Sequence, residues 1–155
     1  MTASGSTVLY GAIPIQLKPS AAEKRALANF AKQLATSVAK GRGFVCMLTD
    51  DSELRRLNAQ FLGNDYPTDV LSFPSQRVSG ELGEMAISME RAAAQALAFG
   101  HTCLDEIRIL MLHGVLHLIG LDHENDCGEM AKAERQWRSE FELPKTLIAR
   151  SRVLA

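Results

Sequence analysis

The stretch HGVLHLIGLDH, residues 113–123, holds three of the four histidines in this 155-residue chain. His113 and His117 stand four positions apart, so on a helix both imidazoles project from one face, with Cβ atoms roughly 5–6 Å apart. Gly120 is the residue type that ends a helix in a left-handed turn, after which the chain can return to deliver His123. Three nitrogen ligands leave a zinc ion one position open to water, as in catalytic sites. The sequence therefore predicts one Zn²⁺ bound by His113, His117 and His123.

The first two of these histidines belong to a segment that reads as a buried helix. Thr102 and Asp105 form an N-terminal capping pattern before it. A helix that is apolar almost all round is expected to run through the core. The apolar positions are Ile109, Leu110, Met111, Leu112, Val115, Leu116, Leu118 and Ile119.

The remaining elements follow from hydrophobic spacing and capping residues. Strands are predicted at residues 8–17, 43–49, 68–73 and 82–88, and further helices at 20–41, 50–63, 89–99 and from 126 onward. Pro14 favours an edge position for the first strand, and Phe61 is expected on the inner face of the helix at 50–63. We expect an α+β fold, with a small mixed sheet of about four strands, about five helices and the metal site on the buried central helix. Residues 1–155 read as one domain with loose termini at 1–7 and 145–155.

The composition is that of an ordinary globular protein, with 46% hydrophobic and 23% charged residues and a net charge of −1. A protein with this charge would need a local basic patch to bind a nucleic acid. Three cysteines without a CxxC pair favour a reducing compartment, although Cys127 is an alternative fourth metal ligand. No signal segment and no apolar run of about 20 residues is found, so we expect a cytoplasmic protein without a membrane span.

An open zinc site predicts hydrolysis. Three neutral imidazoles leave the ion its double charge, which lowers the pKa of bound water toward about 7. Zinc peptidases of the HExxH type carry a glutamate directly after the first histidine, but this chain has Gly114 there. Asp122 is the candidate catalytic residue for proton transfer; alternatively it orients a ligating histidine.

A second informative stretch is DYPTDVLSFP, residues 65–74. Its two prolines are compatible with an ordinary edge strand flanked by polar turn residues. An edge strand beside a metal can also line the path of an extended substrate. Thr68, Asp69 and Ser72 are therefore candidate substrate-binding residues.

Together the two stretches resemble the bacterial YbeY family of metal-dependent endoribonucleases. The family motif HGxLHLxGxDH matches residues 113–123, and PTDVLSFP matches residues 67–74. A Gly-acidic-x-x-Ile-Ser strand matches residues 83–88, with Glu84 where aspartate is usual. The resemblance extends from about Val8 to Phe141. It implies zinc on the three histidines and a single-strand-specific ribonuclease that acts on small-subunit ribosomal RNA, in maturation of its 3′ end and in ribosome quality control. It also implies a ribosomal protein or an assembly GTPase as partner.

One position departs from that family. Leu62 stands where an arginine is usual, and leucine cannot make the forked hydrogen bonds by which arginine holds a phosphate. Either Arg55, Arg56 or Arg77 takes over this role, or phosphodiester cleavage is weak. Leu62 leaves a second function open, a non-catalytic ribosome assembly factor with a structural metal. The open zinc site and the net charge of −1 are also compatible with a different zinc hydrolase, such as a peptidase or esterase.

Overall fold

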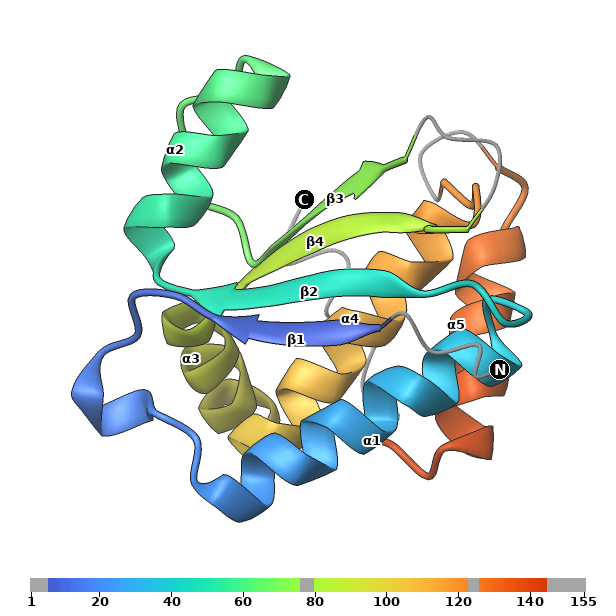
Figure 1. Ribbon diagram of the computed structural model, residues 1–155, viewed down its shortest axis with the longest axis horizontal. Coiled ribbons are helices and arrows are strands. Elements are labelled where there is room, and N and C mark those ends of the chain that lie inside the picture. The colour runs from blue at the N-terminus through green and yellow to red at the C-terminus, as the bar shows by residue number, and fades with distance from the viewer. Residues whose placement is uncertain (1–5, 76–79, 123–125, 145–155) are drawn as a thin grey trace.

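A four-stranded mixed sheet lies at the centre of the computed structural model, which describes residues 6–75, 80–122 and 126–144 (Figure 1). The strands follow the order β1-β2-β4-β3, with β1 and β3 at the two edges. β1, β2 and β4 are parallel to one another, and β3 runs antiparallel to β4. The bounds are Thr7–Tyr10 for β1, Phe44–Thr49 for β2, Val70–Pro74 for β3 and Gly83–Ser88 for β4.

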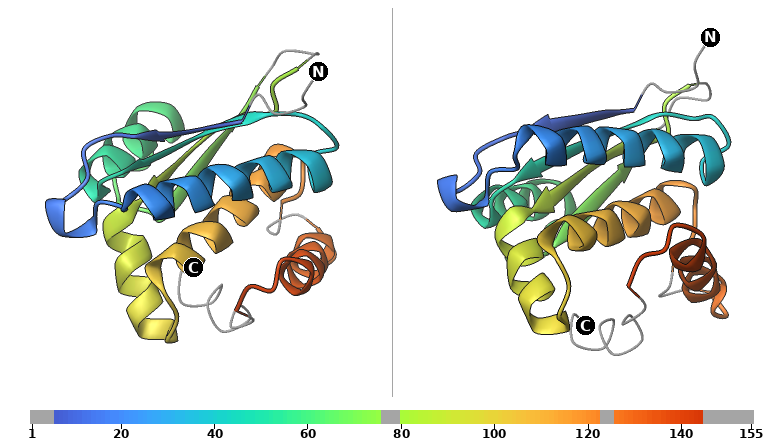
Figure 2. Two further views of the ribbon diagram at one scale, coloured as in Figure 1. Left: turned by 60° about the horizontal axis from the view of Figure 1, so that its bottom comes forward. Right: turned by 90° about the horizontal axis from the view of Figure 1, so that it is seen from below.

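Five α-helices pack around this sheet in the described part of the chain, which confirms the predicted α+β fold. They are α1 (Ala21–Ser37), α2 (Asp51–Leu62), α3 (Met89–Phe99), α4 (Cys103–Leu118) and α5 (Glu129–Glu140). α1, α3 and α4 cover one face, and α5 lies on the side of α4 (Figure 2). None of the described helices has the length and apolarity needed to cross a lipid bilayer.

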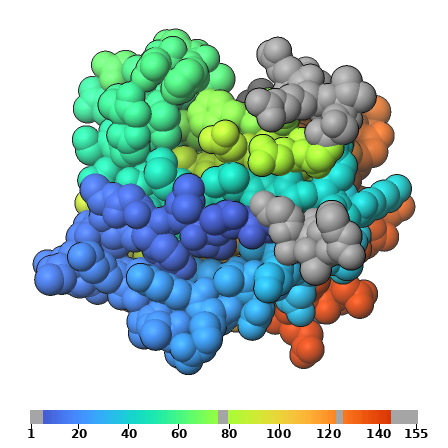
Figure 3. Space-filling model, in the orientation of Figure 1, coloured from blue at the N-terminus to red at the C-terminus, as the bar shows by residue number. Residues whose placement is uncertain are grey.

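Successive residues of β4 show that α2 and α4 lie on opposite faces of the sheet. Met85 and Ile87 belong to the main core with α4, whereas Ala86 packs with Leu54 of α2 and Leu71 of β3. Neighbouring strand residues point to opposite faces, so the two helices are separated by the sheet. The face that carries α2 is covered only at one end, and parts of β2 and β4 remain visible on it (Figure 3).

The predicted starts of α1, α2 and α4 are confirmed by their caps, whereas the helix expected from 126 onward begins at Glu129, after Gly128, and has no side-chain cap. Ser20 and Glu23 form a reciprocal capping box at α1, with bonds of 3.1 Å and 2.8 Å. The Asp50 side chain accepts from a backbone N–H of α2, and the Thr102 side chain does the same for α4. These local signals act within one turn of chain, which explains why the sequence alone reveals them.

Two predictions, one about the first strand and one about α2, are wrong in detail. The strand expected at 8–17 ends at Tyr10, and Ile15–Leu17 forms a 3₁₀ turn after Pro14, which has no N–H to offer a strand ladder. Phe61, expected to face inward, is 58% exposed, and its ring makes an edge-to-face contact with the Phe73 ring at a centroid distance of 5.6 Å. The C-terminal half of α2 therefore projects beyond the apolar surface that holds Leu54.

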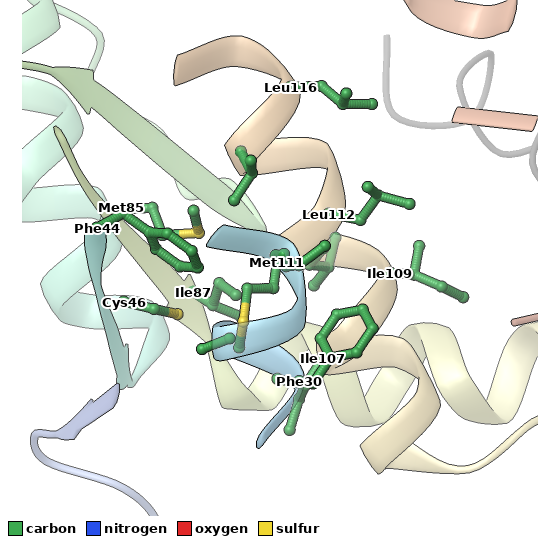
Figure 4. Close-up of a cluster of buried hydrophobic side chains, with 14 of the residues drawn as sticks. Phe30, Phe44, Cys46, Met85, Ile87, Ile107, Ile109, Met111, Leu112 and Leu116 are labelled. Carbon is green, nitrogen blue, oxygen red and sulfur yellow. The ribbon is translucent and has the colours of Figure 1, made fainter. Parts of the chain in front are cut away.

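The core fixes α4 from several sides. Figure 4 shows Met111 of α4 near buried side chains of β2 and β4, whereas Leu112 projects from another side of the helix within the same core cluster. Each large side chain buried in this way contributes about 1.5–3 kcal/mol relative to exposure. The labelled partners are Phe30, Phe44, Cys46, Met85 and Ile87. α4 is thus a rigid support for whatever its polar side chains do.

A buried ion-pairing contact holds the start of α4. His101 Nε2 lies 2.5 Å from Glu106 Oε1, and both side chains are almost fully buried. We expect Glu106→Gln to lower the free energy of unfolding by about 1–3 kcal/mol, because a charge-assisted hydrogen bond in the interior is weakened. Urea unfolding of the two proteins measures this difference. An unchanged midpoint would show that the carboxylate charge contributes nothing to the fold.

Candidate metal centre

His113 and His117 face each other on α4, as the sequence predicts. Their Nε2 atoms are 3.1 Å apart, and the ring centroids are 4.7 Å apart at an interplanar angle of 74°. Both residues are half-buried, on a helix whose other positions are largely buried. The four-residue spacing and the packed helix together bring the two nitrogens to one point.

This geometry fits a shared divalent cation. Two nitrogens bound to one tetrahedral zinc ion at about 2.0–2.1 Å lie about 3.3 Å apart, close to the observed separation. Without a cation, an N–H···N hydrogen bond spans this distance, with one neutral imidazole protonated on Nε2. A metal cation bound between the two nitrogens would replace that proton. The donor set is also the one that zinc and other first-row metals prefer.

Glu134 of α5 is a part of the site that sequence analysis missed. Its Oε1 lies 2.5 Å from His113 Nδ1, and the residue is only 8% exposed. An ionised carboxylate only accepts hydrogen bonds, so the proton in this contact lies on Nδ1. One sequence signal was available. Met130, Glu134 and Trp137 follow at helical spacing, which places an acidic residue at an inward position of an amphipathic helix.

The third predicted ligand, His123, lies outside the described residues. Over residues 6–75, 80–122 and 126–144, no group of three or more histidine, cysteine or acidic side chains is close enough to hold a metal ion. Asp122 is described, half-buried, beside an open pocket of about 360 Å³ that also contains Asp126 and Cys127. Whether Asp122 moves a proton or orients a ligand stays a prediction.

Two of the candidate substrate residues contact different helices: Ser72 contacts α4 and Asp69 contacts α3. The Ser72 hydroxyl donates to the Gly114 carbonyl of α4 over 3.4 Å, so this side chain contacts the residue that directly follows His113. The Asp69 carboxylate accepts from the Val70 N–H and from Gln95 of α3, so it faces the other end of the strand. Thr68 is half-buried just before β3. Ser72 is therefore the better placed to meet a substrate near the histidines.

Close packing of α4 against the sheet explains why residue 114 is a glycine. A Cβ atom built there would lie 2.7 Å from Met85 Sδ and 3.3 Å from Ser72 Oγ. The absent side chain lets α4 approach β3 and β4 closely. A glutamate at this position would have to displace the end of the buried Met85 side chain.

The arginines proposed to replace the missing guanidinium are tied to carboxylates. Arg55 Nε lies 2.9 Å from Asp65, and Arg56 binds Glu53 at 2.7 Å. Each contact raises the pKa of its arginine, chiefly through the side-chain hydrogen bond. Leu62, at the end of α2, is 52% exposed. Arg77 lies outside the described residues. Both of the candidate arginines that the structure describes, Arg55 and Arg56, therefore have a carboxylate partner.

Comparisons with known proteins show which family this chain resembles. The family model described as Endoribonuclease YbeY matches residues 15–142. A protein of Solibacter usitatus with that name is 51% identical over 146 residues, covering 94% of this chain and 95% of its own length. A protein of Koribacter versatilis with the same name is 49% identical over 118 residues, which cover 76% of this chain and 77% of its own length. The solution structure of TM1509 from Thermotoga maritima superposes with a TM-score of 0.58 at 26% identity, covering 88% of this chain and 91% of that one.

Proposed function

Because the chain belongs to the YbeY endoribonuclease family, we propose that it is a zinc-dependent endoribonuclease specific for single-stranded RNA. The observation that carries the metal dependence is the 3.1 Å approach of the His113 and His117 Nε2 atoms. When bound there, a divalent cation would polarise a phosphoryl oxygen and acidify a water molecule.

The chain's own residues support this reaction in distinct ways. His113 and His117 present their nitrogens from a helix that the core holds still, so no reorganisation is needed when RNA arrives. Ser72 lies on the edge strand next to α4, and its hydroxyl contacts the carbonyl of the residue after His113. β3 is an edge strand of the described sheet, and an edge strand can pair with an extended chain.

We further propose that the substrate is ribosomal RNA of the small subunit, cut in maturation of its 3′ end and in ribosome quality control in the cytoplasm. Membership of the family and the matched residues 67–74 and 113–123 support this proposal. A ribosomal protein or an assembly GTPase is the proposed partner, because the net charge of −1 provides little general attraction to RNA.

The direct test uses purified protein and one RNA sequence in single-stranded and duplex form. We expect the single strand to be cut, the duplex to survive, and chelation to stop cleavage until zinc is restored. A substrate with one deoxyribose at the cut position separates the two chemical routes, since it survives only if the 2′-hydroxyl attacks. Failure to cut any single-stranded RNA in the metal-loaded state would contradict the proposal.

Leu62 favours one alternative, a ribosome assembly factor whose metal is structural. Such a protein would bind small-subunit particles with unchanged affinity when it lacks hydrolytic activity. Metal-dependent turnover of RNA by the isolated protein excludes this alternative, whereas metal-dependent folding without turnover supports it.

We expect Leu62→Arg to tighten binding of single-stranded RNA about threefold to tenfold. The slope of log affinity against log salt concentration should become more negative by about one, because one more phosphate is neutralised. The turnover number should stay unchanged, because position 62 lies on α2 and the histidines lie across the sheet. Binding titrations at several salt concentrations and single-turnover cleavage measure both quantities. Leu97→Arg, at another exposed leucine on α3, is the matched control. A large rise in turnover would show that the guanidinium acts on the reacting phosphate.

A further inference from the structure

Two histidine–glutamate pairs with the same nitrogen–oxygen distance involve α4, one through Nδ1 of the imidazole and the other through Nε2. His113 contacts Glu134 and His101 contacts Glu106, each at 2.5 Å and each with a buried carboxylate. The first pair lies toward the C-terminal end of α4 and the second at its N-terminal end. The chain thus contains an internal comparison between two similar contacts in different surroundings.

The two pairs differ in the other contact that each imidazole makes. His113 turns its Nε2 toward the Nε2 of His117 at 3.1 Å, so its ring lies between a carboxylate and a second nitrogen ligand. His101 stacks on the Phe99 ring at a centroid distance of 6.4 Å. In the first pair the histidine is placed to pass the influence of the carboxylate to a cation bound between His113 and His117.

Glu134 is held in place by its own helix. Arg138 lies one turn later on α5, is 2% exposed, and donates from Nη1 to the Pro144 carbonyl over 2.9 Å. Burial lowers the pKa of Arg138 to about 10, and the negative charge of Glu134 opposes this shift. The guanidinium therefore remains positive at neutral pH and stabilises a carboxylate that would otherwise be costly to bury.

We propose that Glu134 is the positioning residue of the metal centre. It fixes the His113 ring with the proton on Nδ1, keeps the Nε2 lone pair directed at the cation, and increases the electron density of that nitrogen. The proposal rests on the metal-dependent function proposed above. It makes α5 part of the site, since a carboxylate from α5 decides how a histidine of α4 binds. Partners of this kind are worth about 10–100-fold in metal affinity.

The test compares Glu134→Gln and Glu134→Ala with Glu106→Gln. Zinc affinity is measured by competition with a chelator of known affinity, and stability by urea unfolding. Trp137, the single tryptophan of the chain, lies on α5 three residues after Glu134, so its fluorescence reports zinc addition independently of RNA cleavage. We expect zinc affinity to fall about tenfold in Glu134→Gln and about 100-fold in Glu134→Ala. Glu106→Gln should lose stability but keep wild-type affinity.

Each outcome decides the proposal. It is overturned if Glu134→Gln binds zinc within twofold of the wild type, even when wild type and variant both cut RNA. It is also overturned if Glu134→Gln and Glu106→Gln lose affinity equally, because the effect would then be general destabilisation. A wild-type protein that binds no zinc overturns both this inference and the metal dependence of the proposed function. The Gln variant keeps the shape of the side chain, so the comparison holds even if the Ala variant fails to fold.

Discussion

His117→Ala is expected to abolish stoichiometric zinc binding and to lower the rate of RNA cleavage by about 10³-fold or more. The substitution removes one of two nitrogens that meet at 3.1 Å. A metal supplies several kcal/mol of transition-state stabilisation to phosphoryl chemistry, and each 1.36 kcal/mol is a factor of about ten in rate. Metal analysis and single-turnover cleavage of single-stranded RNA measure the two losses.

His101→Ala is the control for this experiment. It removes a buried imidazole near the other end of the same helix, so it tests destabilisation of α4 without touching the pair of facing nitrogens. Assayed below its melting temperature, it should retain zinc and activity. If His117→Ala keeps wild-type cleavage, or if His101→Ala loses as much as His117→Ala, the histidine pair is not the reactive centre.

Gly114→Glu is expected to destabilise the fold by about 4 kcal/mol or more and to confer no peptidase activity, although it creates an HExxH sequence. The new Cβ alone would lie 2.7 Å from Met85 Sδ in the core, and overpacking of this kind costs about 1–3 kcal/mol. A buried unpaired carboxylate adds several kcal/mol. For a chain of this size we expect the melting temperature to fall by about 8–16 °C. Thermal unfolding and a casein assay provide the measurements.

Ala94→Glu, at an exposed position of α3, introduces the same side chain without a steric conflict. It should change stability by only a few tenths of a kcal/mol, because alanine and glutamate are both good helix formers. A Gly114→Glu protein as stable as Ala94→Glu would show that α4 can move away from β3 and β4 at little cost. The explanation of Gly114 as a close-packing residue would then be wrong.

Much of the fold could be predicted because its signals are local. The capping residues Ser20, Asp50 and Thr102 act within one helical turn, and the apolar run of α4 identifies the helix that the core buries on nearly every side. The histidine pair belongs to the same class, since a spacing of four on a helix is enough to bring His113 and His117 together. The order and direction of the strands depend on contacts between distant segments of the chain. The sequence pattern therefore predicts a mixed sheet but not the arrangement of its strands.

The parts that could not be predicted depend on such distant contacts. Glu134 and His113 are 21 residues apart on different helices, and only the packing of α5 against α4 makes them neighbours. Phe61 has the spacing of an inward residue, yet α2 extends past the surface that could cover it. The end of the first strand at Tyr10 is set by the loop that carries Pro14 rather than by the apolar pattern.

The central claim is that two nitrogens of α4 meet at one divalent cation. The most direct measurement is an anomalous-difference map, collected at the zinc absorption edge from crystals of protein purified without chelator. Our account predicts one peak per chain, about 2.0–2.1 Å from the Nε2 atoms of both His113 and His117. A map with no peak between these two nitrogens, or a full-occupancy peak elsewhere, would contradict it.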